Sequence, residues 1–404
     1  MAYHTPGHNN SQFLKNLRAI NEKAKVEPDI IDLIEAFARL KLDTNKPFEF
    51  YPDTIRQNPS DFNEFLKKNK HLDPQVLQFL KFYFETVEKR GLKCLLNKDH
   101  LSHMLGITAN RLEWLASPNV THYKYFNIRK SNGSERKIFA PKMYLKGIQR
   151  KILDHILIKV QLHSHAEGFR KKRSILTNAK RHIGKKIVIK MDLKDFFPSI
   201  TFPRVLGFFR SLGYPENVSM ILTKLVVHQG KLPTGAPTSP VISNILATKL
   251  DKRFCELGKK KGFDYSRYAD DLTVSSNDTT IKMMIPFFKR IIQEEGFEIN
   301  KAKLRILRNS NRQKITGIVV NQKANIEKND IKKIRAVIYN LRHKDVDKQI
   351  KKWAQLEGGA DKKRAYSMDQ FKSSLLGKIN YIRMVNPKAG QKLLNQWRAF
   401  EKTV

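Results

Sequence analysis

The stretch SRYADDLTVSS, residues 266–276, places two adjacent carboxylates in a short segment that is otherwise apolar and β-branched. Strand-like residues flank Asp270 and Asp271 on both sides, a pattern that predicts a β-hairpin with both aspartates at its tip. Asp-Asp is frequent in ordinary turns, so the dipeptide alone does not indicate a function. The neighbouring segments therefore have to show whether Asp270 and Asp271 belong to an ordinary turn or to a functional site.

A second acidic strand end lies upstream of this hairpin. Residues 187–193, IVIKMDL, form a β-rich run that ends near Asp192, 78 positions before Asp270 (270 − 192). Pairing the two strands would bring the carboxylates together, where they repel one another unless a cation neutralises them. Two-metal phosphoryl transfer needs hard oxygen ligands held in this way around Mg²⁺. The two strand ends are therefore predicted to form one metal site.

The charge balance indicates a polyanionic partner. The chain of 404 residues carries 77 Lys and Arg against 38 Asp and Glu, a formal net charge of +39. Such a surplus repels itself in the folded state and is most easily tolerated beside nucleic acid, whose counterions are released on binding. A generally basic housekeeping domain is the alternative.

Cysteine usage and apolar runs predict a cytoplasmic protein. Cys94 and Cys255 stand far apart, without CxxC or His-x-His company, and are expected to be reduced thiols. The N-terminus, MAYHTPGHNNSQF, is polar, and no run approaches the roughly 18 apolar residues of a membrane span. We expect neither export nor membrane insertion.

Apolar spacing predicts an α+β chain. Helical periodicity over residues 11–40 and 61–90 predicts a helical N-terminal extension, residues 1–94. Two strand-like runs around Asn132-Gly133 predict a hairpin, followed by a helix with an apolar stripe over residues 145–157. Past residue 325 the pattern becomes basic and helical, and Lys and Arg alternate there with apolar positions.

The order YKYFNIRKSNGSERKIFAP, MDLKDFF, LPTGAPTSPVISN and YADD resembles the reverse transcriptase family over about residues 95–385. The resemblance implies a right-hand polymerase fold, with fingers (95–185), a palm with an antiparallel sheet (186–320) and a basic helical thumb (321–404). It also implies that Asp192 and Asp270 ligate two Mg²⁺ ions with the help of Asp271, and that deoxynucleoside triphosphates are the substrates.

The resemblance assigns a nucleotide-binding role to further residues. Phe197, five residues after Asp192, would lie beneath the incoming sugar and exclude a 2′-hydroxyl, although Phe196 or Phe197 could instead belong to the core. Gly235, in the loop 232–244, would let the backbone approach the nascent base pair closely. Thr234 stands where the family commonly has Gln, so a Gln-specific contact does not carry over.

Basic residues are assigned to the triphosphate. Lys130 and Arg136, in the hairpin KSNGSER, resemble the family's triphosphate-binding strands, and cations there can neutralise β- and γ-phosphates. Lys303, in GFEINKAK, matches the family's N-x-x-K element and would protonate the leaving pyrophosphate. On its own, each of these features is more often part of a solvated surface.

Two signatures narrow the resemblance to retron reverse transcriptases. SILTNAKRH contains Asn178 and His182 in an NAxxH arrangement, and KITGIVVN contains Thr316-Gly317 in a VTG-like arrangement with Ile in place of Val. If helical, Asn178 and His182 share one face at i and i+4, as a purely structural polar pair also would. The basic thumb residues predicted to contact RNA are Lys332, Lys333 and Arg335.

The retron resemblance implies a cognate structured noncoding RNA, a single-stranded cDNA primed from an RNA 2′-hydroxyl, and a nearby effector or toxin protein in defence against phage. The N-terminal extension could recognise the RNA, contact the effector, build oligomers or support the fingers. Other bacterial defence enzymes and intron-type enzymes share the palm motifs. An RNA-templated RNA polymerase and a catalytically silent RNA-binding scaffold are the remaining alternatives.

Overall fold

The computed structural model describes residues 81–129, 133–357 and 366–401, apart from residues 82, 86 and 96. The helices predicted over residues 11–40 and over most of 61–90, and also Lys130, lie outside these residues. The described residues divide into two units. The first holds residues up to 125, 139–161 and 197–246, and the second holds 126–138, 162–196 and 247–401.

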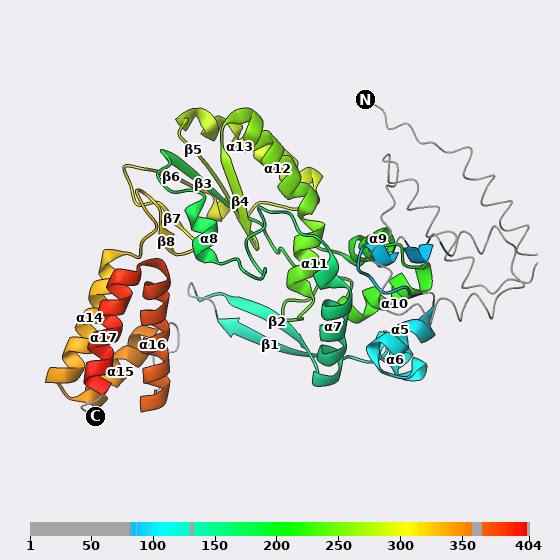
Figure 1. Ribbon diagram of the computed structural model, residues 1–404, viewed down its shortest axis with the longest axis horizontal. Coiled ribbons are helices and arrows are strands. Elements are labelled where there is room, and N and C mark those ends of the chain that lie inside the picture. Colours follow the sequence, from blue (N-terminus) through cyan, green and yellow to red (C-terminus); the bar gives the residue numbers. More distant parts are fainter. Residues whose placement is uncertain are drawn as a thin grey trace, which may run out of the picture. The chain divides into compact units, whose positions relative to one another are not determined.

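The first unit is mainly helical (Figure 1). Its helices are α5 (Lys98–Leu105), α6 (Ala109–Ala116), α7 (Met143–His155), η1 (Leu157–Lys159), α9 (Phe202–Ser211), α10 (Glu216–Val226) and α11 (Ser239–Leu246). The predicted helix over 145–157 is confirmed by α7. Helix α9 has a proline in its first turn, where the missing N–H costs nothing, and packs its apolar side on α10 and α11.

The predicted hairpin around Asn132-Gly133 is confirmed by its two strands. These are β1 (Tyr123–Arg129) and β2 (Glu135–Pro141), which pair with each other. Most side chains of β1 and about half of those of β2 are exposed, as expected for a hairpin that does not pack on a hydrophobic core.

An antiparallel sheet in the order β4-β5-β3-β6 forms the centre of the second unit. The strands are β3 (Ile187–Asp192), β4 (Asp264–Tyr268), β5 (Asp271–Ser276) and β6 (Arg305–Arg308). The register pairs Ile189 with Val274 and Asp192 with Asp271. The predicted strand over 187–193 and the predicted YADD hairpin are therefore confirmed, and they are neighbours in one sheet.

Both faces of this sheet are covered, which explains the continuous apolar run of β3. On one face Tyr265 stacks on Phe254 of α12 (Thr248–Lys261), with ring centroids 4.8 Å apart, and Phe254 contacts Phe288 of α13 (Ile285–Glu294). Alternate residues point to the other face. There α8 (Ile175–Lys180) packs on β4 and on the small hairpin β7 (Lys314–Ile315) and β8 (Ile318–Val319).

Four basic helices follow the sheet in the second unit. They are α14 (Lys328–His343), α15 (Val346–Glu357), α16 (Met368–Val385) and α17 (Pro387–Glu401). Their apolar sides share one core, in which Trp353 and Trp397 contact Phe371 edge to face. The remaining elements are short: η2 (Thr279–Met284) and η3 (Lys301–Lys303). Among the described residues, no helix is long and apolar enough to span a membrane.

Candidate active site

Three carboxylates meet at one end of the central strand pair. Asp192 is the last residue of β3, and its Cα partner across the ladder is Asp271, the first residue of β5. Asp270 lies in the turn between β4 and β5, where its carbonyl oxygen accepts a hydrogen bond of 2.9 Å from the Leu193 amide. The structure thus brings together the three aspartates predicted to form the site.

The carboxylates stand in an environment that disfavours their negative charge. Burial raises the pKa of Asp270, and the nearby carboxylates of Asp192 and Asp271 raise it further. Burial also raises the pKa of Asp271, against which the charge of Lys190 acts. A cation would relieve both the burial cost and the mutual repulsion, because it favours the ionised form. The donor set consists of hard oxygen atoms, and it fits a divalent ion such as Mg²⁺.

Lys303 joins the same site from η3. Its ammonium group donates to both carboxylate oxygens of Asp192, at 2.9 and 3.0 Å, while about half of the side chain stays exposed. This hydrogen bond raises the pKa of Lys303, and burial acts in the opposite direction. The lysine therefore remains protonated beside the aspartates.

A buried arginine, Arg267, stabilises the turn that carries Asp270. Arg267 donates to the Ala269 carbonyl oxygen at 3.1 Å, and its guanidinium makes two hydrogen bonds to Asp251 of α12, at 2.8 and 2.7 Å. Neither side chain of this ion pair is exposed to solvent. Ala269 itself has a positive φ of 58°, a strained conformation for a residue with a side chain.

A segment ahead of α8 packs directly against this turn. The amide of Glu167 donates to the Arg267 carbonyl at 2.8 Å, and the Arg267 amide donates to the His165 carbonyl at 2.9 Å, so the segment extends the sheet beside β4. A Cβ atom at Gly168 would lie 2.7 Å from the Ala269 nitrogen, a distance that excludes any side chain. Glycine at 168 is what lets the two backbones meet.

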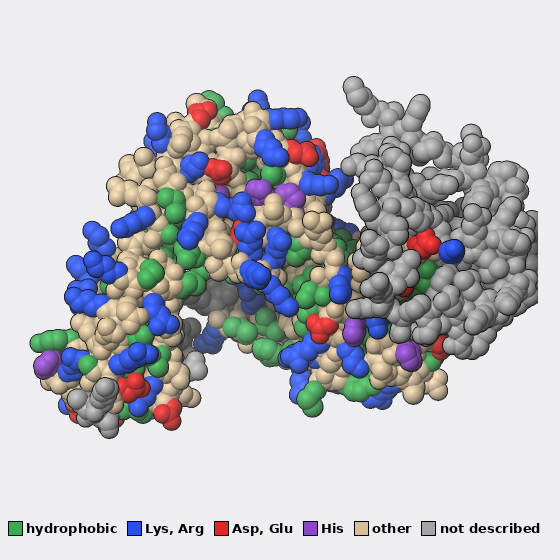
Figure 2. Space-filling model, in the orientation of Figure 1, with side chains coloured by type: hydrophobic (Ala, Val, Ile, Leu, Met, Phe, Trp, Pro, Cys, Tyr) green, Lys and Arg blue, Asp and Glu red, His purple; other side chains and the backbone are tan. Residues whose placement is uncertain are grey.

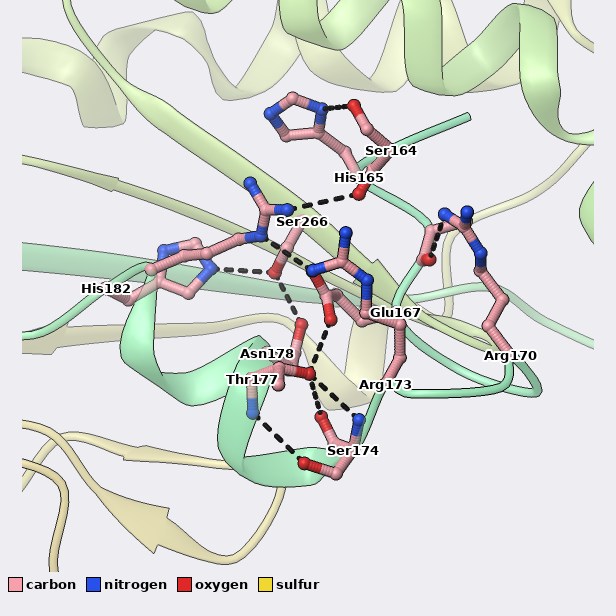
Figure 3. Close-up of polar contacts among 12 residues, drawn as sticks. Ser164, His165, Glu167, Arg170, Arg173, Ser174, Thr177, Asn178, His182 and Ser266 are labelled. Carbon is pink, nitrogen blue, oxygen red and sulfur yellow. Dashed lines mark hydrogen bonds and ion pairs between the residues drawn. The ribbon is translucent and has the colours of Figure 1, made fainter. Parts of the chain in front are cut away.

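The two signature motifs form one buried hydrogen-bond chain, and Figure 3 shows its part from His182 through Ser266 to Asn178. His182 contacts Ser266 through Nε2 and Ser275 through Nδ1, each at 2.7 Å. Ser266 donates to Asn178 at 2.6 Å, so it accepts from His182 and leaves Nδ1 to accept from Ser275. Asn178 then donates to the Thr316 hydroxyl at 3.4 Å.

This chain is structural in character. Burial lowers the pKa of His182 to about 3, so the imidazole is neutral at pH 7. Asn178 and His182 are buried, and Thr316 and Gly317 form the turn between β7 and β8, with positive φ at both residues as such a turn requires. Helical i, i+4 spacing does not relate Asn178 to His182, because α8 ends at Lys180 and His182 lies beyond it. We infer that the signature fixes α8 to the YADD hairpin.

Glu167 adds a charged anchor beside this chain, as Figure 3 shows. Its buried carboxylate accepts from the Thr177 hydroxyl at 2.6 Å and from Arg181 at 2.7 Å, and it lies 3.5 Å from Arg173. The anchor joins the basic segment GFRKKR to the start of α8. Sequence reasoning missed Glu167, Arg267 and Asp251, whose partners are distant in sequence or give no motif.

The predicted nucleotide-binding residues of the first unit are described within that unit. Phe197 is half-buried, whereas Phe196, in the second unit, is buried against Phe297, with ring centroids 5.6 Å apart. The Thr234 carbonyl accepts from the Phe139 amide at 2.9 Å, which ties the loop to the end of β2. Gly235 has a φ of 128°, which favours glycine.

Basic side chains predicted to meet phosphates are exposed. Arg136 is exposed on β2, while Lys130 lies outside the described residues. Lys332, Lys333 and Arg335 are exposed on α14. Figure 2 shows many Lys and Arg side chains on this face of the molecule and few acidic ones.

Comparison with known proteins gives one consistent result. Residues 128–320 match the family described as "Reverse transcriptase (RNA-dependent DNA polymerase)". The Retron Mx162 reverse transcriptase of Myxococcus xanthus is 34% identical over 79% of this chain and 70% of its own length. The Retron Mx65 reverse transcriptase of the same organism is 31% identical, over 75% and 71%. The Retron Ec86 reverse transcriptase of Escherichia coli is 36% identical, over 64% and 83%.

A solved structure of telomerase from Candida albicans is similar with a TM-score of 0.41 and 11% identity, over 71% of this chain and 62% of that one, which is too distant to bear on function. The retron relatives are much more similar in sequence, and the matches to this chain cover more than two thirds of the length of each relative. The chain therefore belongs to the retron reverse transcriptases, RNA-directed DNA polymerases with the right-hand polymerase fold.

Proposed function

We propose that this chain copies a cognate structured noncoding RNA into single-stranded DNA, that synthesis starts from a 2′-hydroxyl of that RNA to give a branched RNA-DNA molecule, and that the product acts with an effector protein in defence against phage. The meeting of Asp192, Asp270 and Asp271 at one strand end is the observation that carries the catalytic part. The retron relatives support the rest.

We propose that the three aspartates bind two Mg²⁺ ions. Enzymes of this family use divalent metal ions, which when bound activate the attacking hydroxyl and stabilise the leaving pyrophosphate. The protein would hold the oxygen ligands on the paired strands β3 and β5, and the buried Arg267 would support the turn through its hydrogen bond to the Ala269 carbonyl. Lys303 keeps a proton beside Asp192 and would supply it to the leaving pyrophosphate.

The resemblance to the family assigns the other roles, and the charge and exposure of the basic residues support them. Arg136, together with Lys130, would neutralise the nucleotide's triphosphate, and the loop with Thr234 and Gly235 would contact the nascent base pair. The exposed basic face of α14 would grip the RNA stem and the new duplex through phosphates. In this proposal the fingers, palm and thumb span residues 95–185, 186–320 and 321–404, after an extension over 1–94.

Nucleic acid recovered with the protein tests this function. The chain is expressed with its native flanking DNA, and the copurified nucleic acid is sequenced after separate RNase and DNase treatments. We expect one discrete single-stranded DNA joined to a short RNA. Heterogeneous or RNA-free DNA would move the enzyme to another class of bacterial defence reverse transcriptase, and no DNA at all would favour the silent scaffold.

Phe197→Ala should relax the choice of sugar. If the ring excludes the 2′-hydroxyl, its removal raises ribonucleotide incorporation relative to deoxynucleotide by at least about tenfold. Primer extension with each nucleotide class measures the ratio. Phe196→Ala is the matched control, because that ring is buried against Phe297 and its loss should lower stability without changing the ratio. An unchanged ratio in Phe197→Ala would place the gate elsewhere.

A further inference from the structure

Two histidines lie next to the segment that supports the catalytic turn. His163-Ser164-His165 immediately precedes Ala166, which bridges to Arg267 of β4 in parallel orientation. The backbone of His165 is fixed by the hydrogen bond from the Arg267 amide. Figure 3 shows the His165 ring directed away from the Asn178 and His182 side chains. The catalytic proposal uses neither histidine.

Cys255, on α12, completes a three-residue cluster with these histidines. The ligand atoms of His163, His165 and Cys255 all lie within 4.8 Å of one another, and all three residues are half-buried. Cys255 Sγ lies 3.8 Å from His165 Nε2. The expectation that Cys255 has no His-x-His company is therefore wrong. His163-Ser164-His165 is such a pair in the sequence, and only the fold brings it to the thiol.

These distances suit a tetrahedral metal ion. Zn–S and Zn–N bonds of about 2.3 and 2.0 Å separate neighbouring ligand atoms by roughly 3.5 Å. The second nitrogen of His165, Nδ1, lies 3.1 Å from the Ser164 hydroxyl, a partner that can orient the ring as such partners do for metal-bound imidazoles. Burial lowers the pKa of both histidines, which favours their neutral, ligating form.

The donor types distinguish this cluster from the aspartate site. Imidazole and thiolate are ligands for Zn²⁺, whereas Mg²⁺ takes oxygen. The carboxylate of Asp251 acts on both imidazoles and would attract a dication, whereas the positive side chains of Lys252, Arg170 and Arg181 would repel it. A thiolate formed on metal binding would add a negative ligand, so the sulfur should be essential for binding.

We propose that His163, His165 and Cys255 bind one Zn²⁺ ion, with the fourth position open to a water molecule. The ion would join α12 to the segment that continues to Gly168 and lies against the Ala269 turn. It would thus stabilise the YADD hairpin from the side opposite the signature motifs. It would be separate from the Mg²⁺ ions of catalysis.

Cobalt substitution tests this site directly. Full-length protein is freed of metal with a chelator and titrated with Co²⁺, which reports tetrahedral thiolate ligation by visible d–d bands and a near-ultraviolet charge-transfer band. We expect one thiolate-ligated Co²⁺ per chain, read from the charge-transfer band and displaced by Zn²⁺. Cys255→Ser should remove the charge-transfer band and weaken binding by at least about a hundredfold, and His165→Gln should weaken it similarly.

Two controls separate this site from others. Cys94→Ser removes the other thiol and should leave the titration unchanged, and so should Asp270→Asn, which alters only the catalytic site. In the unmutated protein, Zn²⁺ should protect Cys255 from alkylation, as read by mass spectrometry, so the test does not depend on a variant that folds. Absence of the band, its persistence in Cys255→Ser, or undiminished alkylation would each overturn the proposal and leave the polymerase assignment intact.

Discussion

Replacing Asp270 and Asp271 together by asparagine should abolish Mg²⁺-dependent DNA synthesis. In the proposed metal site the two carboxylates would be oxygen ligands beside Asp192, and metal ligation supplies several kcal/mol of transition-state stabilisation, so the rate should fall by about three orders of magnitude or more. Primer extension on an RNA template with Mg²⁺ measures the loss. Synthesis at a normal rate in this variant would disprove the aspartate site.

The same variant should remain folded. Burial and mutual repulsion raise the pKa values of both aspartates, so neutral amides remove an unfavourable interaction and stability should not fall. Circular dichroism and denaturant unfolding check this point. Asp264→Asn is the matched control, since Asp264 begins β4 at the other end of the hairpin and pairs with Lys185 at the surface. It should retain both the fold and synthesis.

Asp251→Ala should be strongly destabilising. Asp251 accepts two hydrogen bonds from Arg267 and one from the Tyr265 hydroxyl, at 2.8 Å, and both members of the ion pair are fully buried. Its removal leaves a buried guanidinium without its counter-charge, a change that typically costs about 3–5 kcal/mol in the free energy of unfolding. Denaturant unfolding followed by far-ultraviolet circular dichroism measures the loss.

A surface ion pair provides the comparison for Asp251→Ala. Glu294 of α13 pairs with Arg253 of α12, and about half of the Glu294 side chain is exposed. Exposed pairs contribute about 1 kcal/mol or less, so Glu294→Ala should change the free energy of unfolding only slightly. Equal losses in the two variants would mean that burial does not set the strength of the Arg267 pair. Reduced synthesis in Asp251→Ala at a temperature where it is folded would link this pair to the catalytic turn.

The catalytic strands were predictable because each carries its own local signal. IVIKMD is a β-rich run, and YADD lies between two strand-like runs, so the meeting of Asp192 with Asp271 needed only that the two strands pair. The hairpin β1–β2 and helix α7 followed from turn residues and periodicity in the same way. The identity of the reaction came from the family resemblance, because hydrophobic patterns and turn residues do not indicate a reaction.

The contacts between distant segments could not be predicted. Asp251 is an ordinary acidic position on a basic helix, and only the packing of α12 on β4 turns it into the partner of Arg267. His182 falls beyond the end of α8, and its two serine partners lie on different strands, so helical spacing misjudged its role. The meeting of His163 and Cys255 likewise depends on which face of α12 covers the sheet.

The close approach of Gly168 to Ala269 also limits how this enzyme can evolve. Any side chain at position 168 would displace the backbone of the turn that holds Asp270, so a substitution there would move a proposed catalytic residue. A saturation library should therefore tolerate change at position 168 as poorly as at the aspartates, although Gly168 offers no chemistry of its own. The sequences of the turn and of this segment, which are far apart in the chain, can therefore change only together.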